Sequence, residues 1–155
     1  MHYLSKMHKS NIIGIVGKEV FMNTTDYGTL QIRTYRASEA LPIHNTVVKI
    51  VGSGEYNSEI MISRLTDVDG LTEEIPLPTP NKSLSLSPSP PSVPYSVFDV
   101  DVVKEGYYPK KIFNVPIFAG TKAVLPIEMV PVAYDENGAV IPIKNLNSII
   151  YENNL

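Results

Sequence analysis

Apolar and polar residues alternate along most of this chain with a period of two. Between residues 29 and 36, Leu30, Ile32 and Thr34 fall on one face and the intervening residues on the other. Such alternation is typical of a β-strand with one buried face. Further runs of this kind lie at residues 46–51, 59–66, 71–77, 97–102, 113–117 and 123–129. The sequence therefore predicts an all-β fold, an antiparallel seven-stranded β-sandwich.

The apolar positions of these strands predict a single core between two sheets. Inward side chains on alternating positions must meet those of the facing sheet, because a strand can bury only one face in a two-layer fold. The residues expected in this core are Ile32, Val48, Ile50, Phe98, Val100, Val102, Val115, Ile117, Leu125 and Ile127.

The stretch Asp67-Val-Asp-Gly70 predicts a tight turn between two strands. Glycine adopts a positive φ without a steric penalty, and an aspartate side chain can bond the turn backbone. Asp67 and Asp69 also resemble the start of a calcium loop, but the 12-residue spacing and terminal Glu of that motif are missing. A plain turn is the favoured interpretation.

Proline is concentrated in one part of the chain. Seven of the 13 prolines lie between Pro76 and Pro94, mixed with serines. Because proline cannot donate to a strand ladder, we expect a long Pro/Ser-rich, polyproline-like loop here. A linker between two domains is the competing interpretation. It is disfavoured because neither half alone has enough strands to bury a face.

The domain organisation predicted from these patterns is a β-sandwich over residues 22–133, with a C-terminal tail at 134–155. Residues 1–21 are either an extension or arm that folding does not need, or an extra strand at 11–21 that pairs with an edge or a neighbour. In the first case, a chain shortened to begin at Met22 should unfold like the full chain. The apolar run at residues 12–16 is too short for a secretory signal peptide.

Composition narrows the classes of partner. The chain has 155 residues, of which 43% are hydrophobic and 19% charged, with a net charge of −3. The basic stripe that nucleic-acid binding needs is missing, so we expect no nucleic-acid partner. There is no cysteine, which excludes disulfides and thiolate metal sites. An apolar run of 18 residues is also missing, so the sequence predicts no membrane span, and no motif indicates a cofactor.

Two aspartates are the only obvious candidates for acid–base chemistry. Asp99 and Asp101 project from the same face of one predicted strand, as a catalytic carboxylate pair could. A solvated strand face is the favoured alternative, because nothing nearby indicates a buried pocket. The sequence also lacks the local motifs of serine hydrolases and zinc proteases. We therefore expect a protein that is not an enzyme.

An aromatic and basic cluster is the candidate binding site. Tyr107 and Tyr108 precede Lys110 and Lys111, and Phe113 follows. Aromatic rings beside lysines could stack on sugar rings or anchor a protein partner. The alternative is a tyrosine corner with ordinary core packing, which the sequence favours. The long Pro/Ser loop is a second candidate specificity element.

The order of these motifs resembles a known group of domains. The phrases L-P-I-H-N-T-V-V-K-I, T-D-V-D-G and V-V-K-E-G-Y-Y, in that order, are similar to carboxypeptidase regulatory-like domains. A narrower likeness covers Gly28 to Val132. Within it, G-L-T-E-E-I-P-L-P-T-P-N-K-S-L-S-L at 70–86 and V-P-I-F-A-G-T-K-A-V-L-P-I-E-M at 115–129 resemble the N-terminal domain of clostridial peptidoglycan-binding proteins, including spore cortex-lytic enzymes.

The resemblance implies a transthyretin-like or CnaB-like sandwich that precedes a hydrolase or a peptidoglycan-binding module. Here the chain continues for only about 25 residues after Met129, so hydrolase activity is not carried over. The internal Lys–Asn crosslink of some CnaB-like domains is not expected either. The first strand offers Gln31 and Arg33 instead of a lysine, and residues 123–129 contain no asparagine.

Two function hypotheses remain. The first is a non-catalytic binding or adaptor module of the cell envelope or spore, with peptidoglycan or envelope proteins as partners. The second is a structural subunit or decoration domain of a phage-tail-like particle. Both act through surfaces, and in both an oligomer could form through edge strands, because unblocked edges pair with other strands.

Overall fold

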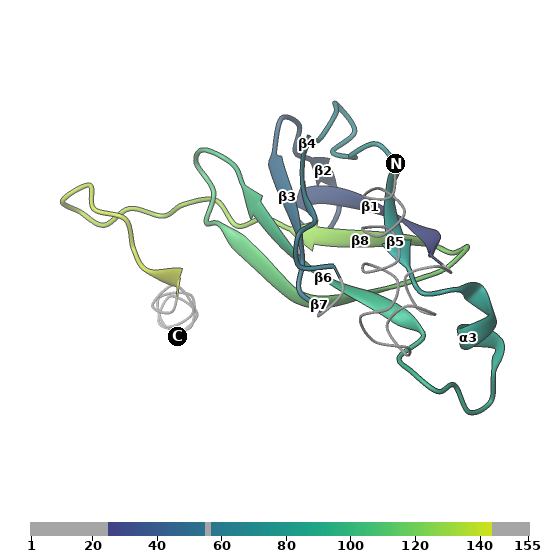
Figure 1. Cartoon of the computed structure of the whole chain (residues 1–155). Helices are drawn as coiled ribbons and strands as arrows, with labels where there is room; N and C mark the ends of the chain where they lie inside the picture. Colours follow the sequence, from purple (N-terminus) through teal and green to yellow (C-terminus); the bar gives the residue numbers. More distant parts are fainter. Residues whose placement is uncertain (1–24, 55–56, 144–155) are drawn as a thin grey trace, which may run out of the picture.

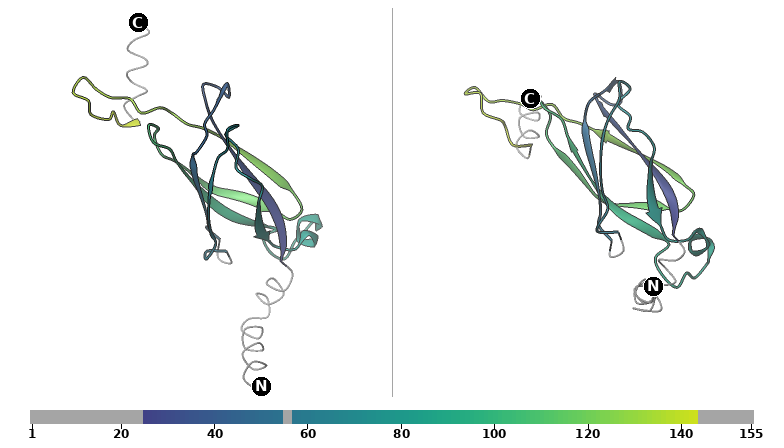
Figure 2. Two further views of the ribbon diagram at one scale, coloured as in Figure 1. Left: turned by 90° about the horizontal axis from the view of Figure 1, so that it is seen from above. Right: turned by 45° about the horizontal axis from the view of Figure 1, so that its top comes forward.

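The computed structural model describes residues 25–54 and 57–143 and shows a two-layer sandwich of β-strands (Figures 1 and 2). The expectations for residues 1–21 and 144–155 lie outside the described residues. The elements are β1 (Asp26–Arg36), β2 (Leu41–Pro42), β3 (Val47–Gly52), β4 (Met61–Leu65), β5 (Ile75–Thr79), α3 (Lys82–Leu86), β6 (Tyr95–Val103), β7 (Lys110–Phe118) and β8 (Lys122–Glu128).

The first sheet is built around β1. Strands β5 and β2 pair with β1 in antiparallel orientation at its two ends, and β8 pairs with it in parallel. The prediction of a wholly antiparallel sandwich is therefore wrong at this pair. The chain crosses from β7 in the other sheet into β8, so β8 enters this sheet running in the direction of β1. Alternation along a strand does not encode that direction.

The second sheet is antiparallel, in the order β4-β3-β6-β7. Its register is regular except for a bulge between Phe98 and Val100, where β7 has one additional residue. Asn114 adopts a φ of 57° at this point. Asparagine tolerates this left-handed conformation better than most other residues. Its backbone N–H donates to Asp99 Oδ1 at 3.0 Å, which fixes the bulged strand against β6.

The predicted Pro/Ser loop from 76 to 94 is only partly correct. Pro76 and Pro78 lie inside β5, and residues 82–86 form α3, with Asn81 Oδ1 accepting from Ser83 N at 2.9 Å as an N-cap. Residues 80–81 and 87–94 are the irregular parts of this stretch. β5 tolerates its prolines because it lies at a sheet edge, where half of the backbone N–H groups need no partner. The described residues contain eight strand segments instead of seven, and β2 has only two residues.

The core lies between the sheets as the alternation predicts. Every expected core residue except Leu125 is buried, and Leu125 is partly buried against the same cluster. Leu30, Ile43, Ile75, Leu77 and Met129 complete the core. Burying a side chain of this size stabilises the fold by about 1.5–3 kcal/mol.

Buried threonines tie the two sheets together at one end of this core. The hydroxyl groups of Thr34 and Thr66 each donate to the Ile43 carbonyl at 2.8 Å, and that of Thr46 donates to it at 3.3 Å. A buried carbonyl without a partner would destabilise the fold, so this convergence holds the connection between β2 and β3 in place. Sequence reasoning did not identify this network.

The predicted turn at residues 67–70 is confirmed. Gly70 has a φ of 74°, its N–H donates to the Asp67 carbonyl at 3.0 Å, and Asp67 Oδ1 accepts from Asp69 N and Leu71 N at 2.9 Å. A Cβ at residue 70 would lie 2.3 Å from the Thr34 carbonyl oxygen. Only glycine fits, both by conformation and by space.

Candidate binding surface

The outer face of the second sheet carries an apolar row at one end. Leu65 on β4, Val47 on β3 and Val103 on β6 are direct cross-strand neighbours. Their side chains are 58%, 43% and 52% exposed. Cross-strand neighbours on one face are in contact range. The row is therefore a strip of apolar surface that crosses three strands.

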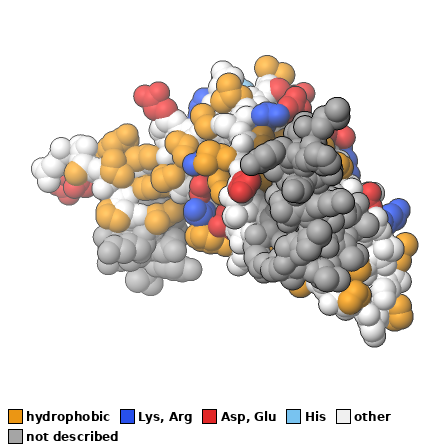
Figure 3. Space-filling model, viewed as in Figure 1, with side chains coloured by type: hydrophobic (Ala, Val, Ile, Leu, Met, Phe, Trp, Pro, Cys, Tyr) orange, Lys and Arg blue, Asp and Glu red, His pale blue; other side chains and the backbone are white. Residues whose placement is uncertain are grey.

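A charged row lies next to it, two residues along each strand. It contains Ser63, Lys49, Asp101 and Lys111, again as cross-strand neighbours. Lys111 Nζ lies 3.4 Å from Asp101 Oδ1 and 5.2 Å from the Phe113 ring centre. Lys49 forms no ion pair with another described residue. Figure 3 shows hydrophobic, basic and acidic side chains interspersed on the visible side of the molecule.

The parts of these two rows on β3, β6 and β7 border an open hollow of about 450 Å³. Lys110 also borders it and donates from Nζ to the Glu128 carbonyl at 2.9 Å. The lining contains three lysines and one aspartate, so the hollow carries a local excess of positive charge on a chain whose net charge is −3. Valine and proline side chains form its apolar part. The hollow suits an anionic group carried on an apolar or ring-shaped body. Its lining residues are Val47, Lys49, Asp101, Val103, Pro109, Lys110 and Lys111.

The structure separates the four predicted site residues into two pairs. Lys110 and Lys111 border the hollow, whereas Tyr108 is only 8% exposed. Its hydroxyl donates to the Ile141 carbonyl and accepts from Ala133 N at 3.2 Å. This position favours the core-packing alternative for Tyr108. Tyr107 is partly buried against the core and forms a bridge with Pro131. Its binding role stays a prediction.

Tyr108 also holds a projecting segment, residues 130–143, which we call the C-terminal arm and which overlaps the C-terminal tail predicted at 134–155. Figures 1 and 2 show this segment extending away from the sandwich. Tyr108 N donates to the Val130 carbonyl and Val132 N to the Gly106 carbonyl, each at 2.9 Å. Beyond this base, Tyr134, Val140 and Ile143 are 61%, 52% and 53% exposed.

The two aspartates considered for acid–base chemistry are used structurally. Asp99 accepts the Asn114 N–H of the bulge, and Asp101 pairs with Lys111. Within the part of the chain that the structure describes, no three His, Cys, Asp or Glu side chains are grouped as metal ligands would be. No helix among those residues has the length and hydropathy to cross a membrane.

Comparisons with known proteins do not assign a family. No model of a protein family and no curated protein matches the chain. Among solved structures, the Bacillus anthracis TIE protein has a TM-score of 0.43 at 16% identity, and the match covers 76% of this chain but only 23% of that protein. The chain thus spans less than a quarter of that protein's length.

A type II cohesin–X-dockerin complex from Acetivibrio cellulolyticus matches at 23% identity, with a TM-score of 0.39 over 83% of this chain and 70% of the other. A chlorocatechol dioxygenase from Rhodococcus opacus matches at 11% identity, with a TM-score of 0.42 over 69% and 60%. At this level of similarity these proteins identify neither a family nor a function. The carboxypeptidase regulatory-like resemblance remains a proposal.

Proposed function

We propose that this chain is a non-catalytic binding module that acts through the hollow on the outer face of its second sheet. The observation that carries the proposal is the arrangement around Lys49, which forms no ion pair with another described residue and shares the hollow with Lys110, Lys111 and an apolar wall. A lysine that forms no ion pair with the described residues around it can bind an external anion through its ammonium group. Binding by surface alone requires no nucleophile or metal.

Peptidoglycan of the cell wall or spore is the partner that this chemistry favours. Its stem peptides carry carboxylates, and its sugar rings present apolar faces that pack against aliphatic and aromatic side chains. Both chemistries match the hollow, and the sequence resemblance to domains of peptidoglycan-binding proteins supports the same partner. An envelope protein with an acidic surface would use the same lysines.

Sedimentation with purified sacculi tests this proposal. Lys49→Glu should reduce the bound fraction about tenfold, because it removes a cation and adds a repelling charge beside Asp101. Lys82→Glu is the matched control: it changes the net charge equally, but residue 82 lies on α3, outside the hollow. Equal loss with both variants would show that only net charge matters, and retention by Lys49→Glu would contradict the assigned site.

A subunit or decoration domain of a phage-tail-like particle is the second candidate, and the C-terminal arm favours it. Exposed apolar side chains on a projecting segment are typical of contacts between subunits. Capture from the native host with the full chain and with Tyr134→Ser/Ile143→Ser separates the candidates. Tail or baseplate proteins that are retained by the full chain and lost with this variant would support the particle.

A further inference from the structure

The edge strands of the sandwich differ in one respect, the presence of proline. Four of the strands at sheet edges contain proline. These are β2 with Pro42, β5 with Pro76 and Pro78, β7 with Pro116, and β8 with Pro126. Each proline removes a backbone donor that an added strand would need, which is a common protection against edge-to-edge pairing. Among the described strands, β4 is the edge strand without a proline.

The hydrogen-bond pattern shows which backbone groups of β4 point away from β3. Gly52 N donates to the Ile60 carbonyl at 2.9 Å and Thr66 N to the Thr46 carbonyl at 3.1 Å. Both bonds join even-numbered residues, and in an antiparallel pair every second residue bonds to the partner strand. The even-numbered residues of β4 therefore bond to β3. The N–H and C=O groups of Met61, Ser63 and Leu65 point away from the sheet.

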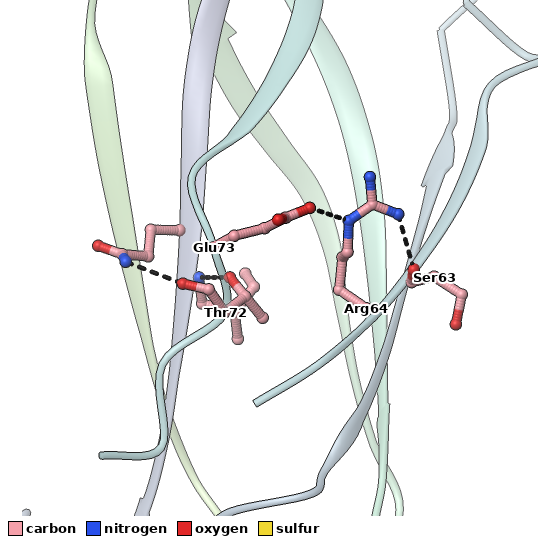
Figure 4. A network of polar contacts seen from close by, with 6 residues as sticks. Ser63, Arg64, Thr72 and Glu73 are labelled. Carbon is pink, nitrogen blue, oxygen red and sulfur yellow. Dashed lines mark hydrogen bonds and ion pairs between the residues drawn. The ribbon is translucent and has the colours of Figure 1, made fainter. Parts of the chain in front are cut away.

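A side chain covers part of this edge. Arg64 Nη1 donates to the Ser63 carbonyl at 2.9 Å, and Arg64 Nε pairs with Glu73, which reaches across from the connection before β5 (Figure 4). The side chains of Arg64 and Glu73 are 40% and 65% exposed. Water and salt weaken an exposed pair of this kind, so it is easily displaced. In contrast to a proline, this cover is reversible.

We propose that β4 pairs in antiparallel orientation with β4 of a second copy of this chain, around a twofold axis at Ser63. The outward-pointing backbone groups of residues 61, 63 and 65 then form the new hydrogen bonds: Met61 bonds to Leu65 of the second copy, and Ser63, once Arg64 releases its carbonyl, bonds to its counterpart. The two four-stranded sheets become one continuous sheet. The interface is isologous, since each copy contributes the same strand.

The side chains on the outer face are self-complementary in this arrangement. Met61 and Leu65 are 65% and 58% exposed. Across the axis, Met61 of one copy lies beside Leu65 of the other. The apolar row of Val103, Val47 and Leu65 continues through Met61 of the second copy. Exposed apolar surface on four strands is thereby joined into one strip, and strand addition gives that surface a partner.

The charges near the axis are compatible with this pairing. Ser63, the residue on the axis, is neutral. The Lys49 side chains of the two copies start about 14 Å apart, three strand spacings, where salt screens their repulsion. Arg64 lies opposite the neutral Ile62 of the second copy, so no like charge faces it across the new pairing. Five residues form a small interface, so the dimer is weak.

Sedimentation equilibrium of the full chain over about 1 μM to 1 mM tests the dimer. Monomer at low concentration and dimer at high concentration are expected. Leu65→Lys should weaken dimerisation at least tenfold, because a lysine at the edge opposes strand addition. Val103→Lys is the matched control, since it adds the same charge to the same row two strands away. It should leave the dimer unchanged.

Cysteine crosslinking tests the position of the axis, and the chain has no cysteine of its own. In Ser63→Cys, the two cysteines face each other with Cα atoms about 5.5 Å apart, within disulfide range. Mild oxidation should yield a covalent dimer. Met61→Cys, on the same strand and face, should yield none, because residue 61 lies four residues from its counterpart across the axis.

A chain that stays monomeric at 1 mM would overturn the proposal. Dissociation by Val103→Lys but not by Leu65→Lys would also overturn it, since that result means that sheet faces pack together instead of edges. Crosslinking of Met61→Cys but not of Ser63→Cys would contradict the axis. Circular dichroism of each variant establishes that it is folded.

Discussion

The two edges of the second sheet, β7 and β4, differ in almost every feature that governs strand pairing. Strand β7 contains Pro116 at a position that faces outward, a bulge at Asn114, and the adjacent lysines 110 and 111. Strand β4 is short and regular, with no proline and two exposed apolar side chains. Bulges, prolines and lysines are the known means of protecting an edge.

This difference indicates that protection is placed selectively. The prolines of the described strands all lie in edge strands, and the interior strands β1, β3 and β6 have none. A protein that blocks all but one edge in this way leaves one pairing direction open. The same sheet thus has a closed side at β7 and a side at β4 that can accept a strand.

The edge at β7 depends on the core beneath it, and truncating the core residue Phe98 should have the largest effect on the free energy of unfolding. Phe98 is fully buried at the bulge between β6 and β7. Phe98→Ala should lower the free energy of unfolding by about 3–5 kcal/mol through lost burial and a cavity. Phe113→Ala, at an exposed position of β7, should change it by less than about 0.5 kcal/mol. Denaturant melts measure both, and equal losses would contradict the assigned faces of β7.

On β4, a proline substitution should affect stability differently at two neighbouring residues, Ile62 and Ser63. Ile62→Pro removes an N–H that bonds to β3 and should cost about 1–3 kcal/mol. Ser63→Pro removes an outward N–H and should leave the stability of the monomer within about 1 kcal/mol of the wild type. Thermal melts at low concentration compare the two variants. If Ser63→Pro lost more stability than Ile62→Pro, the odd-numbered residues of β4, and not the even-numbered ones, would bond to β3.

The smallest change in stability should come from the bulge itself. Asn114 has a φ of 57°, and Asn114→Ala should cost about 1 kcal/mol because alanine disfavours that conformation. Asn114→Gly is the control and should cost nothing, since glycine adopts a positive φ readily. If both variants lose the same amount, the asparagine side chain matters more than the backbone conformation.

The sequence was sufficient to predict the two-layer fold and most of its core. Leu30 and Ile32 illustrate why: a period of two assigns each residue to a face without knowledge of its partners. The parallel pairing of β1 with β8 could not be predicted in the same way, because it depends on where the chain crosses between sheets. Pro78 was assigned to the loop, and Pro76 to both the strand at 71–77 and the loop, because the sequence does not show which strands become edges.

The candidate surface was predicted only in part. Lys110 and Lys111 could be identified because they are adjacent in the sequence. Lys49 and Val47 were missed, since only the register of β3 against β6 brings them beside Asp101 and Val103. The structural role of Tyr108 depends on Ala133 and Ile141, partners at least 25 residues away along the chain. Spacing in the sequence contains no signal for such contacts.

Amide hydrogen exchange, measured by NMR at about 10 μM and 1 mM protein, tests the open edge most directly. The outward N–H groups of Met61, Ser63 and Leu65 on β4 should exchange quickly in the dilute sample and become protected in the concentrated one. Lys111 and Phe118 on β7, whose N–H groups also face outward, should exchange at the same rate in both. Protection that rises on β7, or on neither strand, would contradict the account.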